Sequence, residues 1–147
     1  MRSNFEQEVK QDYALGDRVK YHQNILKELG IQLNPDSKIL DFGCGAGETV
    51  YHYRKQKFQA FGVDIKEYYR AVEENCYQEK LINPTTQIFH TIDTNKYRIP
   101  FEDNTFDFVF SEQVLEHVQN LSEALEEIKR ILKIGGGVQH TLFSAKI

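Results

Sequence analysis

Short apolar segments alternate with longer helix-like segments along nearly the whole chain, and this alternation constrains the fold more than any other feature. The apolar segments are rich in β-branched or aromatic residues, and we expect strands at 38–42, 59–63, 86–92, 106–110 and 138–143. Helical patterns lie between them, at 48–57, 66–81, 114–118 and 120–133. Strands that alternate with helices predict βαβ units, and therefore an α/β fold with a parallel sheet and helices on both faces.

The last of these helices carries the clearest boundary signals. Asn120 and Glu123 have the spacing of an N-terminal capping box, and the glycines at 135–137 predict the end of the helix. Leu121 and Leu125 lie in register with later apolar residues, so we expect them on its buried face.

The N-terminal region reads as helical. Residues 4–29 predict two helical pieces with a break near Gly16-Asp17, and Gly30 is a natural stop. A length of 147 residues is typical of one domain. We therefore expect a single domain over residues 1–147, with an N-terminal helical cap at 1–34 and a core at 35–147.

Composition excludes several functional classes. The chain has 18 basic and 22 acidic residues, for a formal net charge of −4, so binding to nucleic acid through a broadly basic surface is not expected. Cys44 and Cys76 form no CxxC pair, and the five histidines are scattered, so we expect reduced thiols and no metal site. There is neither a long apolar run nor a secretory signal, so we expect a cytoplasmic protein that does not enter a membrane.

A glycine-rich loop, Gly43-Cys44-Gly45-Ala46-Gly47, follows the first predicted strand directly. Glycines at such a place allow positive φ and let a ligand approach the backbone closely. A dinucleotide-binding GxGxxG motif would have its third glycine at position 48, which is Glu48. A carboxylate at the start of the helix repels a pyrophosphate, which disfavours a nicotinamide oxidoreductase and favours a ligand without phosphates.

Acidic residues follow the next two predicted strands. Asp64 lies about 20 residues beyond the glycine loop, where a carboxylate can accept hydrogen bonds from both hydroxyls of a ribose. Its alternative role is a helix cap. Asp93-Thr94 follows the third strand, where a carboxylate can accept a hydrogen bond from an exocyclic amine, or can simply belong to a loop.

Four segments, in this order and spacing, resemble the successive motifs of class I S-adenosylmethionine-dependent methyltransferases. They read ILDFGCGAG, GVDI, RIPFEDNTFDFVFSEQVLEHV and EALEEIKRILKIGGG, and the similarity covers about residues 20–143. The branch that they resemble is the small-molecule methyltransferases of ubiquinone and menaquinone biosynthesis. The resemblance implies a Rossmann-like αβα sandwich and the cofactor S-adenosylmethionine, with S-adenosylhomocysteine as its product.

Carried over residue by residue, the resemblance implies a cofactor site at the strand ends. The glycine loop lies under the methionine part and Asp41 reaches its amino group, whereas Asp64 holds the ribose, Ile65 packs on the adenine, and Asp93 meets the adenine amine. The implied cofactor-binding positions are Asp41, Gly43, Cys44, Gly45, Gly47, Asp64, Ile65, Asp93, Thr94, Ser111, Glu112 and Gln113.

The implied reaction is an in-line displacement at the methyl carbon, so the protein mainly aligns the partners and excludes water. A general base is needed only where the acceptor must lose a proton. His117 is the first candidate, with Glu112 and Tyr13 as rivals, although a histidine in this position can be purely structural. Tyr13 and Tyr21 are candidates for covering the site.

The sequence departs from the family in two respects. The segment after the fourth strand reads SEQV and lacks the Pro-Pro motif of base-modifying amino-methyltransferases, which together with the acidic net charge disfavours a DNA N-methyltransferase and leaves RNA and protein acceptors open. The branch that the segments resemble implies a small-molecule acceptor. The family's sheet usually continues beyond the fifth strand, whereas this chain stops at Ile147, so we expect the usual C-terminal strands to be missing. The alternative function is therefore a truncated cofactor-binding module without turnover. An open strand edge at 138–143 predicts either a homodimer sealed at that edge or a tendency to aggregate, unless the tail bends away and the preceding helix shields the edge.

Overall fold

The computed structural model describes residues 17–112 and 114–141, and the chain divides into two compact units, 1–34 and 35–147. In the first unit, α2 (Arg18–Glu28) begins after Asp17, whose carboxylate accepts a hydrogen bond from the Lys20 N–H at 3.0 Å. This confirms the predicted helix start after Gly16-Asp17. The expected helical piece before it lies outside the described residues.

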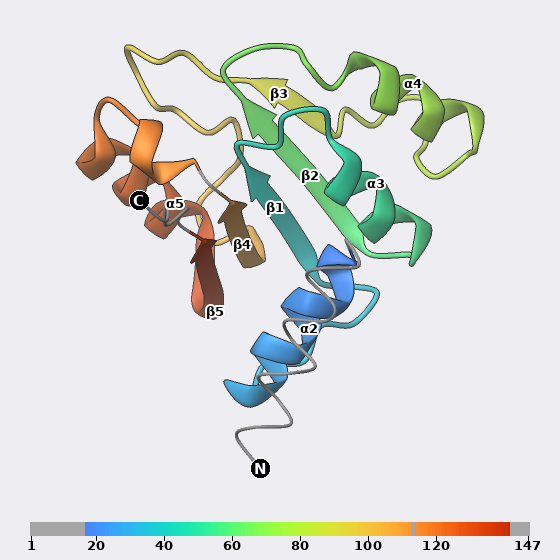
Figure 1. Cartoon of the computed structure of the whole chain (residues 1–147), viewed down its shortest axis with the longest axis horizontal. Coiled ribbons are helices and arrows are strands. Elements are labelled where there is room, and N and C mark those ends of the chain that lie inside the picture. The colour runs from blue at the N-terminus through green and yellow to red at the C-terminus, as the bar shows by residue number, and fades with distance from the viewer. Residues whose placement is uncertain (1–16, 113, 142–147) are drawn as a thin grey trace, which may run out of the picture. The chain divides into compact units, whose positions relative to one another are not determined.

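The second unit is built on five parallel strands in the order β3-β2-β1-β4-β5 (Figure 1). Their bounds are β1 (Lys38–Phe42), β2 (Gln59–Asp64), β3 (Phe89–Thr91), β4 (Phe106–Glu112) and β5 (Leu132–Thr141). Leu40 of β1 pairs with Phe61 of β2 on one side and Val109 of β4 on the other. The predicted α/β fold with a parallel sheet is confirmed. The third strand is shorter than predicted.

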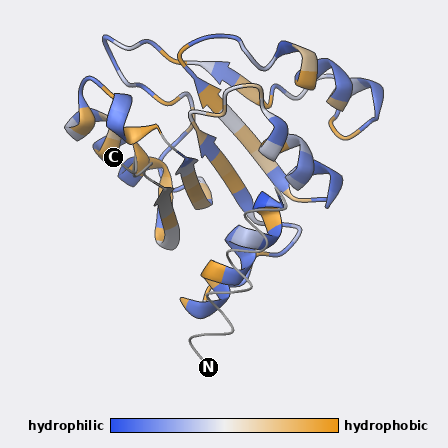
Figure 2. Ribbon diagram, in the orientation of Figure 1, coloured by the Kyte–Doolittle hydropathy of each residue, from blue (hydrophilic) through white to orange (hydrophobic). Residues whose placement is uncertain are grey.

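Helices cover both faces of the sheet. Side chains alternate along each strand, so both faces carry apolar side chains that the helices bury. Leu40 and Phe42 of β1 point to one face, where they join the core cluster that contains Ala124 and Ile128 of α5 (Leu121–Ile131). On the other face, the ring of Tyr53, from α3 (Glu48–Lys55), lies 5.8 Å from that of Phe110. The strands are accordingly hydrophobic along much of their length (Figure 2). The remaining helices are α4 (Arg70–Gln78) and the 3₁₀ helix η1 (Leu115–His117).

The buried face of α5 differs from the one expected. Ala124, Ile128 and Ile131 are buried, whereas Leu121 and Leu125 are 43% and 41% exposed. The predicted N-cap is confirmed, since Asn120 Oδ1 accepts the Glu123 N–H at 3.3 Å.

The C-terminal end of α5 is set by a distant segment rather than by the glycine triplet. The backbone N–H groups of Asn104 and Thr105 donate to the carbonyls of Arg130 and Ile131, at 2.9 and 2.8 Å. These bonds satisfy carbonyls that a continuing helix would otherwise use, so β5 starts at once. The predicted helix end at 135–137 is wrong: these glycines lie within β5, beside an irregularity of its pairing with β4.

A charged network fastens the loop after β3 to α5. The Arg130 guanidinium donates to both carboxylate oxygens of Glu127, at 2.8 and 2.9 Å, and to Asp103. It also donates to the carbonyls of Ile99 and Phe101, each at 2.8 Å. The bond to Arg130 lowers the pKa of Glu127. The Arg130 side chain is only 17% exposed, so its bonds to Glu127 and to the two carbonyls are partly shielded from solvent.

Among the described residues, no helix is both long and apolar enough to cross a membrane.

Candidate functional site

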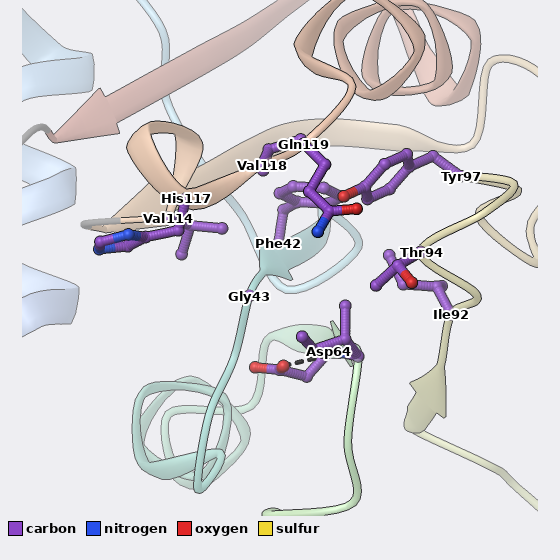
Figure 3. A pocket seen from close by; sticks show the side chains of 11 residues that line it. Phe42, Gly43, Asp64, Ile92, Thr94, Tyr97, Val114, His117, Val118 and Gln119 are labelled. Atoms are coloured by element: carbon purple, nitrogen blue, oxygen red, sulfur yellow. Dashed lines mark hydrogen bonds between the residues drawn. The ribbon is translucent and has the colours of Figure 1, made fainter.

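The carboxyl ends of the strands meet at a cavity of about 250 Å³ (Figure 3). β1 lies between β2 and β4, so the connections leave it toward opposite sides of the sheet. Such a switch point is where open α/β sheets bind ligands. The cavity is lined by Phe42, Gly43, Asp64, Ile65, Ile92, Thr94, Tyr97, Val114, His117, Val118 and Gln119.

Asp64, the last residue of β2, is oriented by two backbone hydrogen bonds. Its Oδ2 accepts the N–H of Gly45 at 2.7 Å, and its Oδ1 accepts the N–H of Ile65 at 2.7 Å. A carboxylate has about four lone-pair sites, so each oxygen keeps capacity for another donor. The side chain is thus held at the rim of the cavity while it can still bind a pair of hydroxyls.

Glycines of the loop are required for two different reasons. Gly45 has φ +52°, a conformation that L side chains rarely adopt, but a Cβ there would meet no protein atom within 4 Å. Gly47 also has a positive φ, and a Cβ on it would lie 2.5 Å from the ring of Phe89. A side chain at position 47 is therefore excluded by packing against Phe89. At position 45 there is space for a side chain, and only the backbone conformation disfavours one.

The buried carboxyl group of Asp41 lies near two other carboxyl groups, Asp64 and Glu112, at the ends of β2 and β4. Asp41 is only 6% exposed, and burial, followed by the charges of Glu112 and Asp64, raises its pKa well above the usual range. Ser111, beside Glu112, is also buried. A cationic ligand group near these carboxyl groups would relieve their repulsion. Among the described residues, no group of three or more His, Cys, Asp or Glu side chains is arranged to hold a metal ion.

Cys44 is packed in the loop as an apolar residue. Burial, followed by the charges of Asp41 and Asp64, raises the pKa of its thiol. A thiol that resists ionisation is a poor nucleophile, so Cys44 contributes to the shape of the loop rather than to covalent chemistry.

The structure brings five of the sequence-predicted site residues to the lining of the cavity: Gly43, Asp64, Ile65, Thr94 and His117. His117 lies on η1 with its side chain 79% exposed, and its Nε2 is 3.9 Å from Glu116 Oε1.

Other predicted positions are not in this lining. Asp41, Ser111 and Glu112 lie near the carboxyl ends of β1 and β4, and Cys44, Gly45 and Gly47 lie in the loop after β1. Gln113 and Tyr13 are outside the described residues. Asp93 is exposed, and its Oδ1 accepts the backbone N–H of Asn95 at 2.8 Å. The role assigned to Asp93 at an adenine amine therefore stays a prediction.

Sequence reasoning missed six of the eleven lining residues, among them Phe42 at the end of β1. Val114, Val118 and Gln119 belong to the segment after β4, so their place beyond a strand end was an available signal. Ile92 follows β3 in the same way. Tyr97 had no such signal, because it reaches the cavity from within an irregular loop.

The chain is similar in sequence and fold to known methyltransferases. Residues 40–138 match the family model described as a methyltransferase domain. Over 123 residues the chain is 31% identical to 24-methylenesterol C-methyltransferase 3 of Arabidopsis thaliana, covering 81% of this chain and 32% of that protein. It is 29% identical to the demethylmenaquinone methyltransferase of Symbiobacterium thermophilum, covering 87% of this chain and 50% of the relative.

A solved structure from Methanococcus maripaludis, described as a putative S-adenosyl-L-methionine-dependent methyltransferase, superposes with a TM-score of 0.65. The match covers 94% of this chain and 62% of that one at 24% identity, and so shows a shared fold. The chain spans a third to a half of the length of the two relatives named above.

Proposed function

The chain belongs to the family of S-adenosylmethionine-dependent methyltransferases, and from this premise we propose that it transfers a methyl group from that cofactor to a small-molecule acceptor. The observation that carries the proposal is the Asp64 carboxylate, which is fixed by Gly45 and Ile65 at the rim of a largely apolar cavity. A ribose that carries a planar base fits such a combination of carboxylate and apolar walls.

The donor groups of the site suit this cofactor in particular. The cofactor has no phosphate, which agrees with Glu48 in the first turn of α3, where it would repel one. It carries an ammonium and a sulfonium group, and a cation beside Asp41 and Glu112 would favour ionisation of the buried Asp41 carboxyl, whose pKa is otherwise raised. We assign Asp41, Gly43, Gly45, Asp64 and Ile65 to cofactor binding.

When bound, the cofactor supplies an already activated methyl group, whose bond to sulfur breaks as a bond to the acceptor forms. The positive charge on sulfur disappears in this displacement, so nearby carboxylates favour binding of the charged donor rather than the transition state. Asp41 and Glu112 therefore act in binding and in discrimination against the neutral product. Rate acceleration then comes from alignment and from exclusion of water by the apolar lining.

Proton removal from the acceptor is assigned to His117 or Glu112. His117 lines the cavity and its imidazole is exposed to a ligand entering from outside, which supports it as the first candidate. A small-molecule acceptor is supported by the relatives, which are named for sterol and demethylmenaquinone substrates.

Two measurements test the proposal. Calorimetry should detect binding of S-adenosylhomocysteine and none of NAD; binding of NAD alone would overturn the cofactor assignment. Transfer of labelled methyl from S-adenosylmethionine to sterol or quinone acceptors should then be measured. Binding without transfer to any acceptor would favour the alternative, a cofactor-binding module without turnover.

A further inference from the structure

We infer, on the basis of the proposed function, that Gln119 and Tyr97 recognise the adenine edge of the cofactor in this protein, in the role that the resemblance assigns to Asp93. Asp93 is exposed and does not line the cavity. Gln119 and Tyr97 do line it, and their side chains are directed into it on the side opposite Asp64 (Figure 3).

The position opposite Asp64 is the one that matters for the base. If Asp64 holds the ribose hydroxyls, the base extends away from it across the cavity, between apolar side chains such as Ile65, Ile92 and Val118. Polar groups at the far wall then meet the edge of the base that is remote from the sugar. Pockets of this kind gain their specificity from a few polar groups in an apolar lining.

Tyr97 is a rigid member of this pair. It is 4% exposed and belongs to the main core cluster, and its backbone N–H donates to Glu123 Oε1 at 3.2 Å. Glu123 in turn accepts from Asn120 Nδ2 at 2.8 Å, at the start of α5. The backbone of Tyr97 is therefore tied to the start of the helix that follows Gln119, while its ring is held by burial in the core cluster.

Neither the Tyr97 hydroxyl nor the Gln119 carboxamide has a hydrogen-bond partner in the part of the chain that the structure describes. A carboxamide offers an acceptor oxygen and two donor hydrogens on one planar group. The adenine edge offers an exocyclic amine beside a ring nitrogen that accepts, and glutamine pairs with adenine edges of this type in two simultaneous hydrogen bonds. The Gln119 oxygen would accept from the amine, with the Tyr97 hydroxyl as a second contact.

The test compares two ligands across a set of variants by calorimetry. The ligands are S-adenosylhomocysteine and its analogue with unsubstituted purine, which lacks the exocyclic amine. The wild-type protein should bind S-adenosylhomocysteine, which has the amine, more tightly than the analogue. Gln119→Leu should weaken S-adenosylhomocysteine about 3- to 10-fold more than it weakens the purine analogue, since only S-adenosylhomocysteine loses the hydrogen bond from the amine, and this difference is the effect of one net hydrogen bond.

Three further variants complete the test. Tyr97→Phe should reduce the preference for the amine in part. Asp93→Asn should leave the preference for the amine unchanged. The matched control is Gln56→Leu, at an exposed glutamine after α3, and it should also leave this preference unchanged.

Two outcomes overturn the inference. If the wild type binds S-adenosylhomocysteine but the preference for the amine survives in Gln119→Leu, or is lost in Asp93→Asn, the assignment to Gln119 is wrong while the proposed function stands. If the wild type binds neither ligand, the proposed function fails and the inference fails with it.

Discussion

The carboxylate of Asp64 accepts the backbone N–H of Gly45 at 2.7 Å, across 19 residues of sequence. This bond ties the end of β2 to the glycine loop that follows β1. Asp64, which is proposed to bind the ribose, is therefore directly bonded to the loop that is proposed to pass beneath the cofactor. A substitution in either is expected to shift the position of the other.

Asp64→Ala is expected to weaken binding of S-adenosylhomocysteine by about 1.5–3 kcal/mol, because charged hydrogen bonds to the ligand are lost. Asp64→Asn keeps one acceptor oxygen without the charge and should show a smaller loss. Calorimetry gives both affinities, and thermal unfolding checks that each variant is folded. Unchanged affinity in Asp64→Ala would remove Asp64 from the site.

Gly45→Val should abolish cofactor binding. No protein atom blocks a side chain there, so the cost in stability is that of positive φ, about 1–2 kcal/mol or more for a β-branched residue, while the side chain projects where the ligand is proposed to lie. Gly30→Val is the matched control, since Gly30 also has positive φ and open space. It should lose stability without losing affinity; normal binding by Gly45→Val would mean that the loop is only a turn.

Asp41→Asn should stabilise the protein at neutral pH and weaken the binding of S-adenosylhomocysteine. The raised pKa of Asp41 means that the folded state holds this proton more tightly than the unfolded state does. Stability from this group is therefore fully present below the unfolded pKa of about 3.9 and is lost as the pH rises through the folded pKa. Urea unfolding across pH should show less decline on the alkaline side for Asp41→Asn; parallel curves would contradict the burial argument.

Arg130→Ala should lower the free energy of unfolding by about 3 kcal/mol, because it removes the donor to two loop carbonyls and leaves Glu127 with only the Ile99 N–H and the exposed Arg98. The lowered pKa of Glu127 adds a pH signature: its stabilisation is present above the unfolded pKa and is lost as the pH falls through the folded pKa. The difference from wild type should therefore shrink in acid. Arg70→Ala breaks an exposed pair with Glu67 at the same i,i+3 spacing, and should cost less than about 1 kcal/mol in urea unfolding. Equal losses would contradict the network argument.

The outer edge of β5 is predicted to pair with a second copy of the chain. β5 is the outermost strand of the described sheet, and Ile134 and Val138 on it are 100% and 42% exposed. Light scattering over a concentration series should detect dimers or larger species, and Val138→Lys should reduce them. Leu29→Lys, at another exposed apolar residue, should not. A monomer at high concentration would mean that this edge is not used.

The elements whose signals are local could be predicted from the sequence. Residues 38–42 and 59–64 form strands where short apolar runs stand, and the N-caps at Asp17 and Asn120 lie within three residues of the N–H groups that they satisfy. Asp64 and the glycine loop could be predicted as site residues because each follows its strand directly, and parallel strands bring their carboxyl ends together.

Tertiary structure decided the features that depend on residues distant in sequence. The end of α5 depends on Asn104 and Thr105, and the closed space at Gly47 depends on Phe89. Tyr97 and Gln119 lie together in the lining of the cavity. Tyr97 comes from the loop after β3, which is bound to α5 through the Tyr97 N–H and Glu123. Backbone preferences and hydrophobic periodicity act over a few residues, so they can be read along the chain, whereas hydrogen bonds and packing between distant segments exist only after the strands have assembled.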